Sequence, residues 1–507
     1  MRSLLLVLTF SLSGVLRPAW SQGELPFDTF EAFTDSLTVV ATISDAAERE
    51  AALDALWDDL AAADQVPFRL GDEAAFLWHG AASTVEIAGD HNNWDPHDSA
   101  LTRLGQSTVW MRTYTFPEAA RIDYKFIVDG NWILDPVNPH QQWGGFGPNS
   151  ELRMPAWVFP EETVRDPEVP VGTLSPNVKL ASTNLGYGVS YRVWTPAGYA
   201  SDNLRDLPVL YAVDGHEYSD DRLGAAQIVL DNLIADGRIE PTIAVFIDLR
   251  IGGQNRREDL YLQNPDFAAF VADELVPVID AEYRTHPDRD SRVILGTSFG
   301  GVFSAYLGVM HPETFGKLAI QSPAFWASEN PGWWDGPSIY EMMADAEESL
   351  FEVYMSSGTV EGIVGDARKM RDVLEANNHA LTYREVPEGH SWGNWRALID
   401  EALIALLPSS TTSAEDGAVP GHSLSLAAYP NPTTSRVAFT FSLDAPARVG
   451  ITCYDVLGRR SHTVIGDTLA APGPHTITSE ALEAAGAYLC HLTAGAQTAT
   501  QTVTVVR

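Results

Sequence analysis

Between residues 170 and 407, short uninterrupted apolar runs alternate with segments of helical periodicity. Val209–Val213 and Thr242–Ile247 are two such runs, and Phe267–Ile279 repeats its apolar residues at helical spacing. A strand that is apolar at every position needs burial on both faces, as in a parallel sheet covered by helices. The alternation therefore predicts an α/β domain with a mostly parallel sheet and helices on both faces.

The rest of the 507-residue chain, which is too long for one ordinary domain, has other periods. Residues 26–66 carry apolar side chains at spacings of three and four, which predicts helices, whereas residues 75–160 alternate with a period of two, which predicts a β-sandwich. We therefore divide the chain into a signal peptide (1–21), a helical collar (22–70), a β-sandwich (71–165), the α/β domain (166–408), a linker (409–423) and a C-terminal β-sandwich (424–507).

The first residues have the pattern of a secretory signal peptide. Arg2 precedes the apolar run Leu4–Leu12, and Ala19 and Ser21 offer small residues for cleavage after position 21. The alternative is an anchor helix, but the apolar run is shorter than the ~20 residues that a membrane span needs. No later stretch is long enough either, so we expect a secreted or cell-surface protein without a membrane span.

The chain carries 68 acidic against 32 basic residues, a net charge of −36. A surface this negative repels nucleic acid and anionic lipid, so we expect neither as a partner. No His, Asp or Glu cluster has metal-ligand spacing and no Gly-rich loop suits a phosphate, so we expect no metal and no cofactor. Cys453 and Cys490 lie on two predicted strands, and the sequence allows two alternatives for them: a disulfide, or two buried free thiols.

Two segments of the α/β domain match the pattern Gly-x-Ser-x-Gly, in which a serine sits on a sharp turn between a strand and a helix. Gly296–Gly300 follows an apolar strand and opens a helix, which is the required context, and it contains Ser298. Gly389–Gly393, around Ser391, follows a proline and has no histidine after it in its own domain. These contexts predict Ser298 as a nucleophile.

His390 lies just before the last helix of the α/β domain. A general base must sit on a loop after a late strand to reach a serine at such a turn, and histidine titrates near neutral pH. The chain order of serine followed by histidine agrees with this fold. We therefore predict that His390 is the general base for Ser298.

At these residues the α/β domain resembles the esterase family of α/β-hydrolases that includes enterochelin esterases, feruloyl esterases and S-formylglutathione hydrolases. The matching stretches are Tyr191–Tyr199, Leu210–Gly215, Asp273–Pro277, Gly296–Gly301, Ser322–Trp326 and Gly389–Trp395. The resemblance implies a serine carboxylic-ester hydrolase that works through an acyl-enzyme.

The resemblance also implies further site residues. The family's acid follows the next-to-last strand in a Gly-x-x-Asp/Glu turn, which makes Glu361 the candidate; Asp366, whose other role is to complement a helix N-terminus, and a dyad without either acid stay open. The oxyanion hole would use the N–H of Phe299 and that of Gly215 or His216. Three tryptophans either wall the substrate pocket or pack beneath the turn: Trp326, Trp392 and Trp395.

The predicted N-terminal sandwich resembles the glycogen-binding-type, immunoglobulin-like carbohydrate modules. The resemblance rests on Ala88–Pro96, Tyr124–Trp132 and Asp135-Pro136. It implies that Trp94, Lys125 and Trp132 contact a sugar, with the indoles stacking on pyranose rings. The alternative is a structural spacer in which both indoles lie in the core or at an interface.

The C-terminal segment resembles a type IX secretion sorting domain. The resemblance rests on four fragments in order: Tyr429–Pro432, Tyr454–Arg459, Gly486–Leu489 and Val503–Arg507. It implies export through the outer membrane with the type IX secretion machinery as a partner. The alternative is a last structural β-domain without an export role.

Together these features predict a secreted serine esterase that acts on acyl esters of plant or algal polysaccharide, of feruloyl or acetyl type. A catecholate siderophore esterase is the alternative substrate class. An alternative of another class is a glycan-binding surface protein without catalysis.

Overall fold

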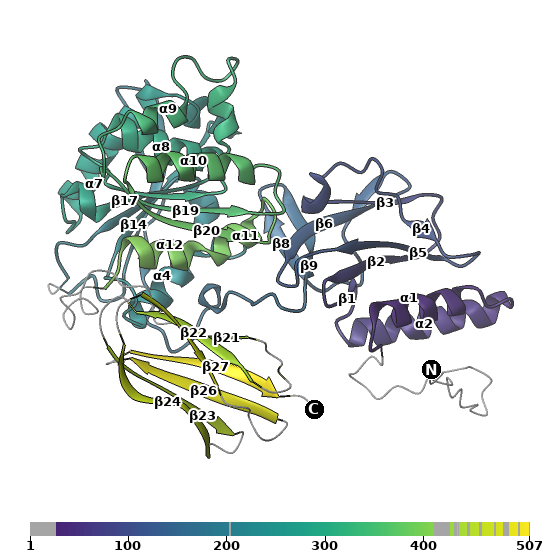
Figure 1. Ribbon diagram of the computed structural model, residues 1–507. Coiled ribbons are helices and arrows are strands. Elements are labelled where there is room, and N and C mark those ends of the chain that lie inside the picture. Colours follow the sequence, from purple (N-terminus) through teal and green to yellow (C-terminus); the bar gives the residue numbers. More distant parts are fainter. Residues whose placement is uncertain are drawn as a thin grey trace. The chain divides into compact units, whose positions relative to one another are not determined.

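The computed structural model describes residues 27–201 and 204–409, and most of 426–505 in segments. The predicted signal peptide and nearly all of the predicted linker lie outside the described residues. The chain divides near residue 412 into two compact units, which are considered separately below. Figure 1 traces both units.

The larger unit begins with the two predicted collar helices, α1 (Phe30–Ala41) and α2 (Ala46–Ala62). Side chains cap both, because Thr29 Oγ1 accepts from Ala32 N (3.1 Å) and Asp45 Oδ1 accepts from Glu48 N (2.9 Å). Their apolar faces pack on strands of the next region, through a shared core that includes Phe33, Leu37, Leu53, Phe68 and Leu77.

Two antiparallel sheets follow. One has the order β1-β2-β5-β4, made of β1 (Phe68–Leu70), β2 (Glu73–His79), β5 (Val109–Thr115) and β4 (Thr102–Arg103). The other has the order β3-β6-β9-β8 with β7 beside β6, made of β3 (Val85–Gly89), β6 (Arg121–Val128), β9 (Gly147–Arg153), β8 (Gln141–Gly144) and β7 (Asn131–Ile133). Phe76, Ile87, Tyr124 and Phe126 join the sheets in one core. We call residues 68–157 the N-terminal module.

The α/β region, which we call the hydrolase domain, is built on one sheet of order β10-β12-β14-β13-β17-β18-β19-β20, with β11 paired to β12. Strand β12 runs antiparallel to β14, and the strands from β14 to β20 are parallel. The strands are β10 (Thr173–Leu174), β11 (Val178–Ala181), β12 (Gly188–Thr195), β13 (Val209–Ala212), β14 (Ile243–Asp248), β17 (Arg292–Thr297), β18 (Lys317–Gln321), β19 (Glu352–Gly358) and β20 (Ala380–Val386). A short hairpin, β15 (Arg250–Ile251) with β16 (Gln254–Asn255), stands apart.

Helices cover both faces of this sheet, as the sequence predicts (Figure 1). One face carries α4 (Ala226–Ala235) and α12 (Ile399–Leu406), and the other carries α8 (Phe299–Met310) and α10 (Val364–Ala376). The segment expected to be one helix from 267 to 279 is α6 (Pro265–Ala269), a wider π turn (Phe270–Leu275) and α7 (Val276–Glu282). The shorter helices are α3 (Gly215–Tyr218), α5 (Arg257–Tyr261), α9 (Ile339–Ala344) and α11 (Trp392–Ala397).

The second unit is β-rich, as predicted. Its sheets have the orders β21-β22-β25 and β24-β23-β26-β27, and their strands are β21 (Ala427–Tyr429), β22 (Ala438–Leu443), β25 (Gly473–Thr478), β24 (Arg460–Ala470), β23 (Ala447–Asp455), β26 (Gly486–Ala494) and β27 (Gln497–Val505). Cys453 and Cys490 face each other on β23 and β26 and form a disulfide. Among the described residues, no helix is long and apolar enough to cross a bilayer.

Candidate active site

Ser298 occupies the turn between β17 and α8, with φ 57° and ψ −118°. A non-glycine residue in this region costs on the order of 1–3 kcal/mol, and such strain is typical of functional turns. Gly296 is required there, because a Cβ on it would lie 2.2 Å from the carbonyl oxygen of Gly300. Two backbone bonds hold the turn: Ser298 N donates to Gln321 O (3.0 Å), and Ala324 N donates to Ser298 O (3.2 Å).

Ser391, in the second match to the pattern, has an ordinary extended backbone with φ −149° and ψ 164°. Its hydroxyl accepts a hydrogen bond from the Arg121 guanidinium (3.1 Å). It therefore lies on no strand-to-helix turn of the required kind.

Ser298, His390 and Glu361 form one hydrogen-bonded row. His390 Nε2 lies 3.0 Å from Ser298 Oγ, and His390 Nδ1 lies 2.7 Å from Glu361 Oε2. A carboxylate only accepts, so a neutral imidazole must carry its proton on Nδ1, which leaves Nε2 free to accept the serine proton. The imidazole packs against Trp395 in a T-shaped arrangement, with ring centroids 5.0 Å apart.

Glu361 is a buried carboxylate, 4% exposed, just beyond the end of β19. Its Oε1 accepts from Ser357 Oγ (2.5 Å) and from Gly358 N (2.7 Å), so both oxygens have donors. Asp366, the rival acid, lies in the first turn of α10 and accepts from Trp326 N (3.2 Å). The row therefore contains Glu361 and not Asp366.

The predicted oxyanion donors lie at the same edge of the sheet. Phe299 is the first residue of α8 after β17, and Gly215 is the first residue of α3 after the neighbouring parallel strand β13. N–H groups in the first turn of a helix have no partner within the helix. A Cβ on Gly215 would lie 2.3 Å from the backbone of Phe246, so this turn also needs glycine. His216 follows it, with Nδ1 3.5 Å from Asp248 Oδ1.

A cavity of about 540 Å³ opens beside Ser298 and His390, between the hydrolase domain and the N-terminal module. Trp94, Lys125 and Trp132 line the same cavity. The Trp132 side chain is about half exposed, and the Trp94 indole donates to Asp90 Oδ1 (3.1 Å). The positions that the resemblance assigns to sugar contact thus share one cavity with Ser298, the predicted nucleophile.

Among the module residues that line the cavity and that sequence reasoning missed are Phe146 and Asn149. Phe146 is fully exposed at the tip of the hairpin between β8 and β9. The signal that could have found it is a lone aromatic residue among glycines, in the run Gly144-Gly145-Phe146-Gly147.

Comparison with known proteins matches two parts of the chain to family models. Residues 182–406 match the family described as "Putative esterase", and residues 73–145 match the one described as "Glycogen recognition site of AMP-activated protein kinase". The match places the hydrolase domain in this esterase family. This domain is a carboxylic-ester hydrolase of the α/β-hydrolase type. It is preceded by a carbohydrate module of the kind found in AMP-activated protein kinase.

Several relatives with similar sequences are named as esterases. The iron(III) enterobactin esterase of Escherichia coli (strain K12) is 28% identical over 387 residues, which are 67% of this chain and 92% of the relative. The endo-1,4-β-xylanase/feruloyl esterase of Xylanibacter ruminicola is 28% identical over 234 residues, 44% of this chain and 31% of the relative. The solved ferric enterobactin esterase of Salmonella typhimurium shares the fold, with a TM-score of 0.58 at 20% identity over 68% of this chain and 95% of that one.

The three tryptophans left open by the sequence lie in two places in this esterase. Trp392 and Trp395 are 2% and 8% exposed and pack in the core, and both also line the cavity. The Trp392 indole donates to Glu217 Oε2 (2.9 Å). Trp326 is exposed and packs with Trp333 and Phe299, so it belongs to an aromatic cluster next to Ser298.

Charged residues of the esterase also line the cavity. The Arg257 guanidinium donates to the buried carboxylate of Asp214 (2.9 Å) and to Thr297 O (3.3 Å). Burial raises the pKa of Asp214, and Arg257 partly opposes that rise. In the described parts of the chain, no group of three His, Cys, Asp or Glu side chains could hold a metal ion.

Proposed function

We propose that this esterase hydrolyses acyl esters carried by a polysaccharide, with Ser298 as nucleophile, His390 as general base and Glu361 as the acid that orients it. The observation that carries the proposal is the shared cavity: Ser298 and His390 line it together with Trp94, Lys125 and Trp132. A sugar held by the module would present its ester to the serine without leaving the cavity.

The first half of the reaction transfers the acyl group to the enzyme. Ser298 Oγ attacks the ester carbonyl carbon while its proton passes to His390 Nε2, 3.0 Å away. The Glu361 carboxylate stabilises the imidazolium that forms, through the bond to Nδ1. The carbon–oxygen bond to the alcohol then breaks, and His390 returns the proton to the leaving alkoxide.

The second half restores the serine. A water molecule loses a proton to His390 and attacks the acyl carbon, and the acid leaves as Ser298 recovers its proton. In both halves a negative charge develops on the carbonyl oxygen. The N–H groups of Phe299 and of Gly215 or His216, at the edge where β17 and β13 end, are the donors that we assign to it.

A catecholate siderophore ester is the second candidate substrate. Two cationic side chains, Lys125 and Arg257, line the cavity and could hold an anionic ligand. The Escherichia coli relative named for an iron(III) enterobactin esterase also aligns over most of its length. The polysaccharide proposal is preferred because indole rings on the cavity suit a sugar ring.

The test is a substrate panel on the purified full chain: p-nitrophenyl acetate, methyl ferulate, acetylated xylan, feruloylated arabinoxylan and a catecholate trilactone. We expect the highest kcat/KM on a polysaccharide ester, and a loss confined to the polymers in Trp132→Ala. A clear preference for the trilactone, unaffected by Trp132→Ala, would replace the proposed substrate class.

We also propose export by a signal peptide and the type IX secretion machinery. The support is the sequence pattern. The signal peptide lies outside the described residues, and so do parts of three of the four sorting-domain fragments; Gly486–Leu489 is the fragment described in full. Intact-mass measurement of the secreted protein is expected to give a start near Gln22 and loss of the β-rich C-terminal unit. Secreted material that retains Arg507 would contradict a cleaved sorting signal.

A further inference from the structure

The loop that carries the proposed general base lies between two parts of the molecule. This histidine loop, residues 387–391, connects β20 to α11. On the side of the hydrolase domain, Val360 N donates to Glu388 O (3.1 Å) and the Asn394 amide donates to Gly389 O (3.0 Å). Its other side lies against the N-terminal module.

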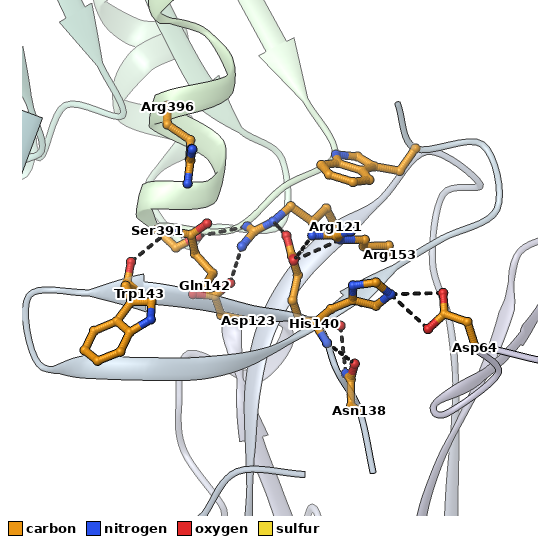
Figure 2. A network of polar contacts seen from close by, with 12 residues as sticks. Asp64, Arg121, Asp123, Asn138, His140, Gln142, Trp143, Arg153, Ser391 and Arg396 are labelled. Atoms are coloured by element: carbon orange, nitrogen blue, oxygen red, sulfur yellow. Dashed lines mark hydrogen bonds and ion pairs between the residues drawn. The ribbon is translucent and has the colours of Figure 1, made fainter. Parts of the chain in front are cut away.

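Arg121, the first residue of strand β6 in the module, makes several contacts with this loop. Its backbone N–H donates to Pro387 O (3.2 Å), and its guanidinium donates to Ser391 Oγ (3.1 Å) and lies 3.6 Å from Glu388 Oε2. Figure 2 shows the guanidinium reaching Ser391. A Cβ on Gly393, in the helix after the loop, would lie 1.8 Å from Arg121 Cζ, so α11 is in direct contact with the guanidinium.

Two more module residues hold the loop. The Trp157 indole donates to Glu388 Oε1 (3.1 Å). Gly389 packs on Asp90 so closely that a Cβ would lie 2.0 Å from its carboxyl carbon. Every residue of the histidine loop except His390 therefore contacts the module, while the His390 imidazole faces Ser298 and Glu361.

The module also contacts the loop of the proposed acid. Val360, next to Glu361, packs against the hydrophobic core of the module. A Cβ on Gly362, on the other side of Glu361, would lie 2.9 Å from Asn93 Oδ1. The module thus touches the chain on both sides of the acid and on both sides of the base.

Arg121 is the charge on which this contact is built. Its side chain is fully buried, and it forms ion pairs with Asp123 (2.5 Å) and Glu151 besides Glu388. Burial alone would lower the pKa of Arg121, but the three carboxylates outweigh it and raise that pKa, so the guanidinium is charged. Its planar fork of five donors is what lets it serve several acceptors at once.

We infer that Arg121 is a positioning residue of the esterase: it fixes the histidine loop so that His390 stays within hydrogen-bond reach of both Ser298 and Glu361. The inference rests on the proposed function of these three residues. It makes the N-terminal module a structural part of the catalytic site and not only a sugar-binding attachment.

The test is a pair of substitutions in the full chain. Arg121→Met removes all contacts of the guanidinium. Arg121→Lys keeps the positive charge but removes the planar group of five donors. A displacement of about 1 Å in a catalytic group can cost on the order of 10²-fold in rate. We therefore expect kcat for p-nitrophenyl acetate to fall about 10²-fold in Arg121→Met and less in Arg121→Lys, with KM little changed.

Arg153→Met is the matched control. Arg153 donates to the same Glu151 carboxylate (2.6 Å) and packs on Trp157 and Phe159, but its bonds do not reach the histidine loop. It perturbs the same buried network without removing the bond to Ser391. We expect kcat within about threefold of the wild type, an effect of less than 1 kcal/mol.

A proton NMR signal separates positioning from stability. The Nδ1 proton shared by His390 and Glu361 should give a low-field resonance in the wild type and in Arg153→Met, and a shifted or absent one in folded Arg121→Lys. Wild-type kcat and resonance in either folded Arg121 variant would overturn the inference, as would an equal loss in Arg153→Met. If Arg121→Met does not fold, Arg121→Lys alone decides.

The same signal distinguishes failure of this inference from failure of the proposed function. If the wild type neither hydrolyses esters nor reacts with a fluorophosphonate, the proposed function is wrong. The resonance needs no turnover, so it still reports whether Arg121 positions His390.

Discussion

Replacing Glu361 by glutamine should reduce ester hydrolysis about 10³-fold. The carboxylate is 4% exposed and accepts from His390 Nδ1, Ser357 Oγ and Gly358 N. Glutamine has nearly the same shape, but it removes the charge that stabilises the imidazolium and offers an NH₂ group where an acceptor is needed. A buried hydrogen-bonded charge is worth about 3–5 kcal/mol to its partner, and each 1.4 kcal/mol changes the rate about tenfold.

The assay is steady-state hydrolysis of p-nitrophenyl acetate, with kcat/KM of Glu361→Gln compared with that of Asp366→Asn. Asp366 is the matched control, since it bonds to Trp326 N and not to the imidazole. We expect Asp366→Asn to stay within about threefold of the wild type, a change of less than 1 kcal/mol. A Glu361→Gln enzyme within tenfold of the wild type, or a larger loss in Asp366→Asn, would refute the assignment of the acid.

Three further predictions concern the cavity, the module and the C-terminal unit. Trp132→Ala should raise KM on a polysaccharide ester about fivefold, the equivalent of ~1 kcal/mol of ring stacking, and leave the hydrolysis of p-nitrophenyl acetate unaffected. The control is Trp143→Ala, which removes an indole that packs on Arg222 outside the cavity. Equal effects in the two variants would contradict the sugar subsite. Burial and the charge of Asp123 raise the pKa of Asp90 from 3.8 to about 7, so folding favours the protonated form, and the stability that this form contributes should be lost as the pH rises from about 4 to about 7. In urea unfolding across this range, the free energy of unfolding of Asp90→Asn should therefore rise relative to that of the wild type as the pH rises. A difference that stays constant with pH would be evidence against the raised pKa. The Cys453–Cys490 disulfide links residues 37 positions apart, so Cys453→Ser/Cys490→Ser should lower the unfolding free energy of the C-terminal unit by about 3–4 kcal/mol without changing esterase activity. Alkylation of both cysteines in unreduced wild-type protein would contradict the disulfide.

The α/β-hydrolase fold was predictable because its signals are local. The apolar runs at Val209–Val213 and Thr242–Ile247 became the buried strands β13 and β14, and the strand before Gly296 became β17. The collar helices followed from the spacing of their apolar residues. Strand β1 at Phe68–Leu70 pairs with β2, so the first sheet of the module begins before residue 71, where the sequence led us to divide collar from sandwich. That strand is too short for its period to show in the sequence.

The site could be predicted only in part. Ser298, His390 and Glu361 each stand in a short pattern, and their roles stay predictions until the variants are measured. The contacts of Arg121 could not be predicted, because the bond to Ser391 joins residues 270 positions apart and no sequence pattern links the two. The packing of Trp392 and Trp395 could not be predicted either. The sequence does not distinguish a tryptophan that only fills a core from one that also lines a cavity.

The role of Ser298 is tested most directly by labelling the native protein with a fluorophosphonate probe and finding the modified residue by peptide mass spectrometry. The probe reacts only with a serine that is activated by a base. The geometry of the row predicts a single label on Ser298, with Ser391 unmodified. A label on Ser391, or none on a folded protein, would contradict the assignment of Ser298 as the nucleophile.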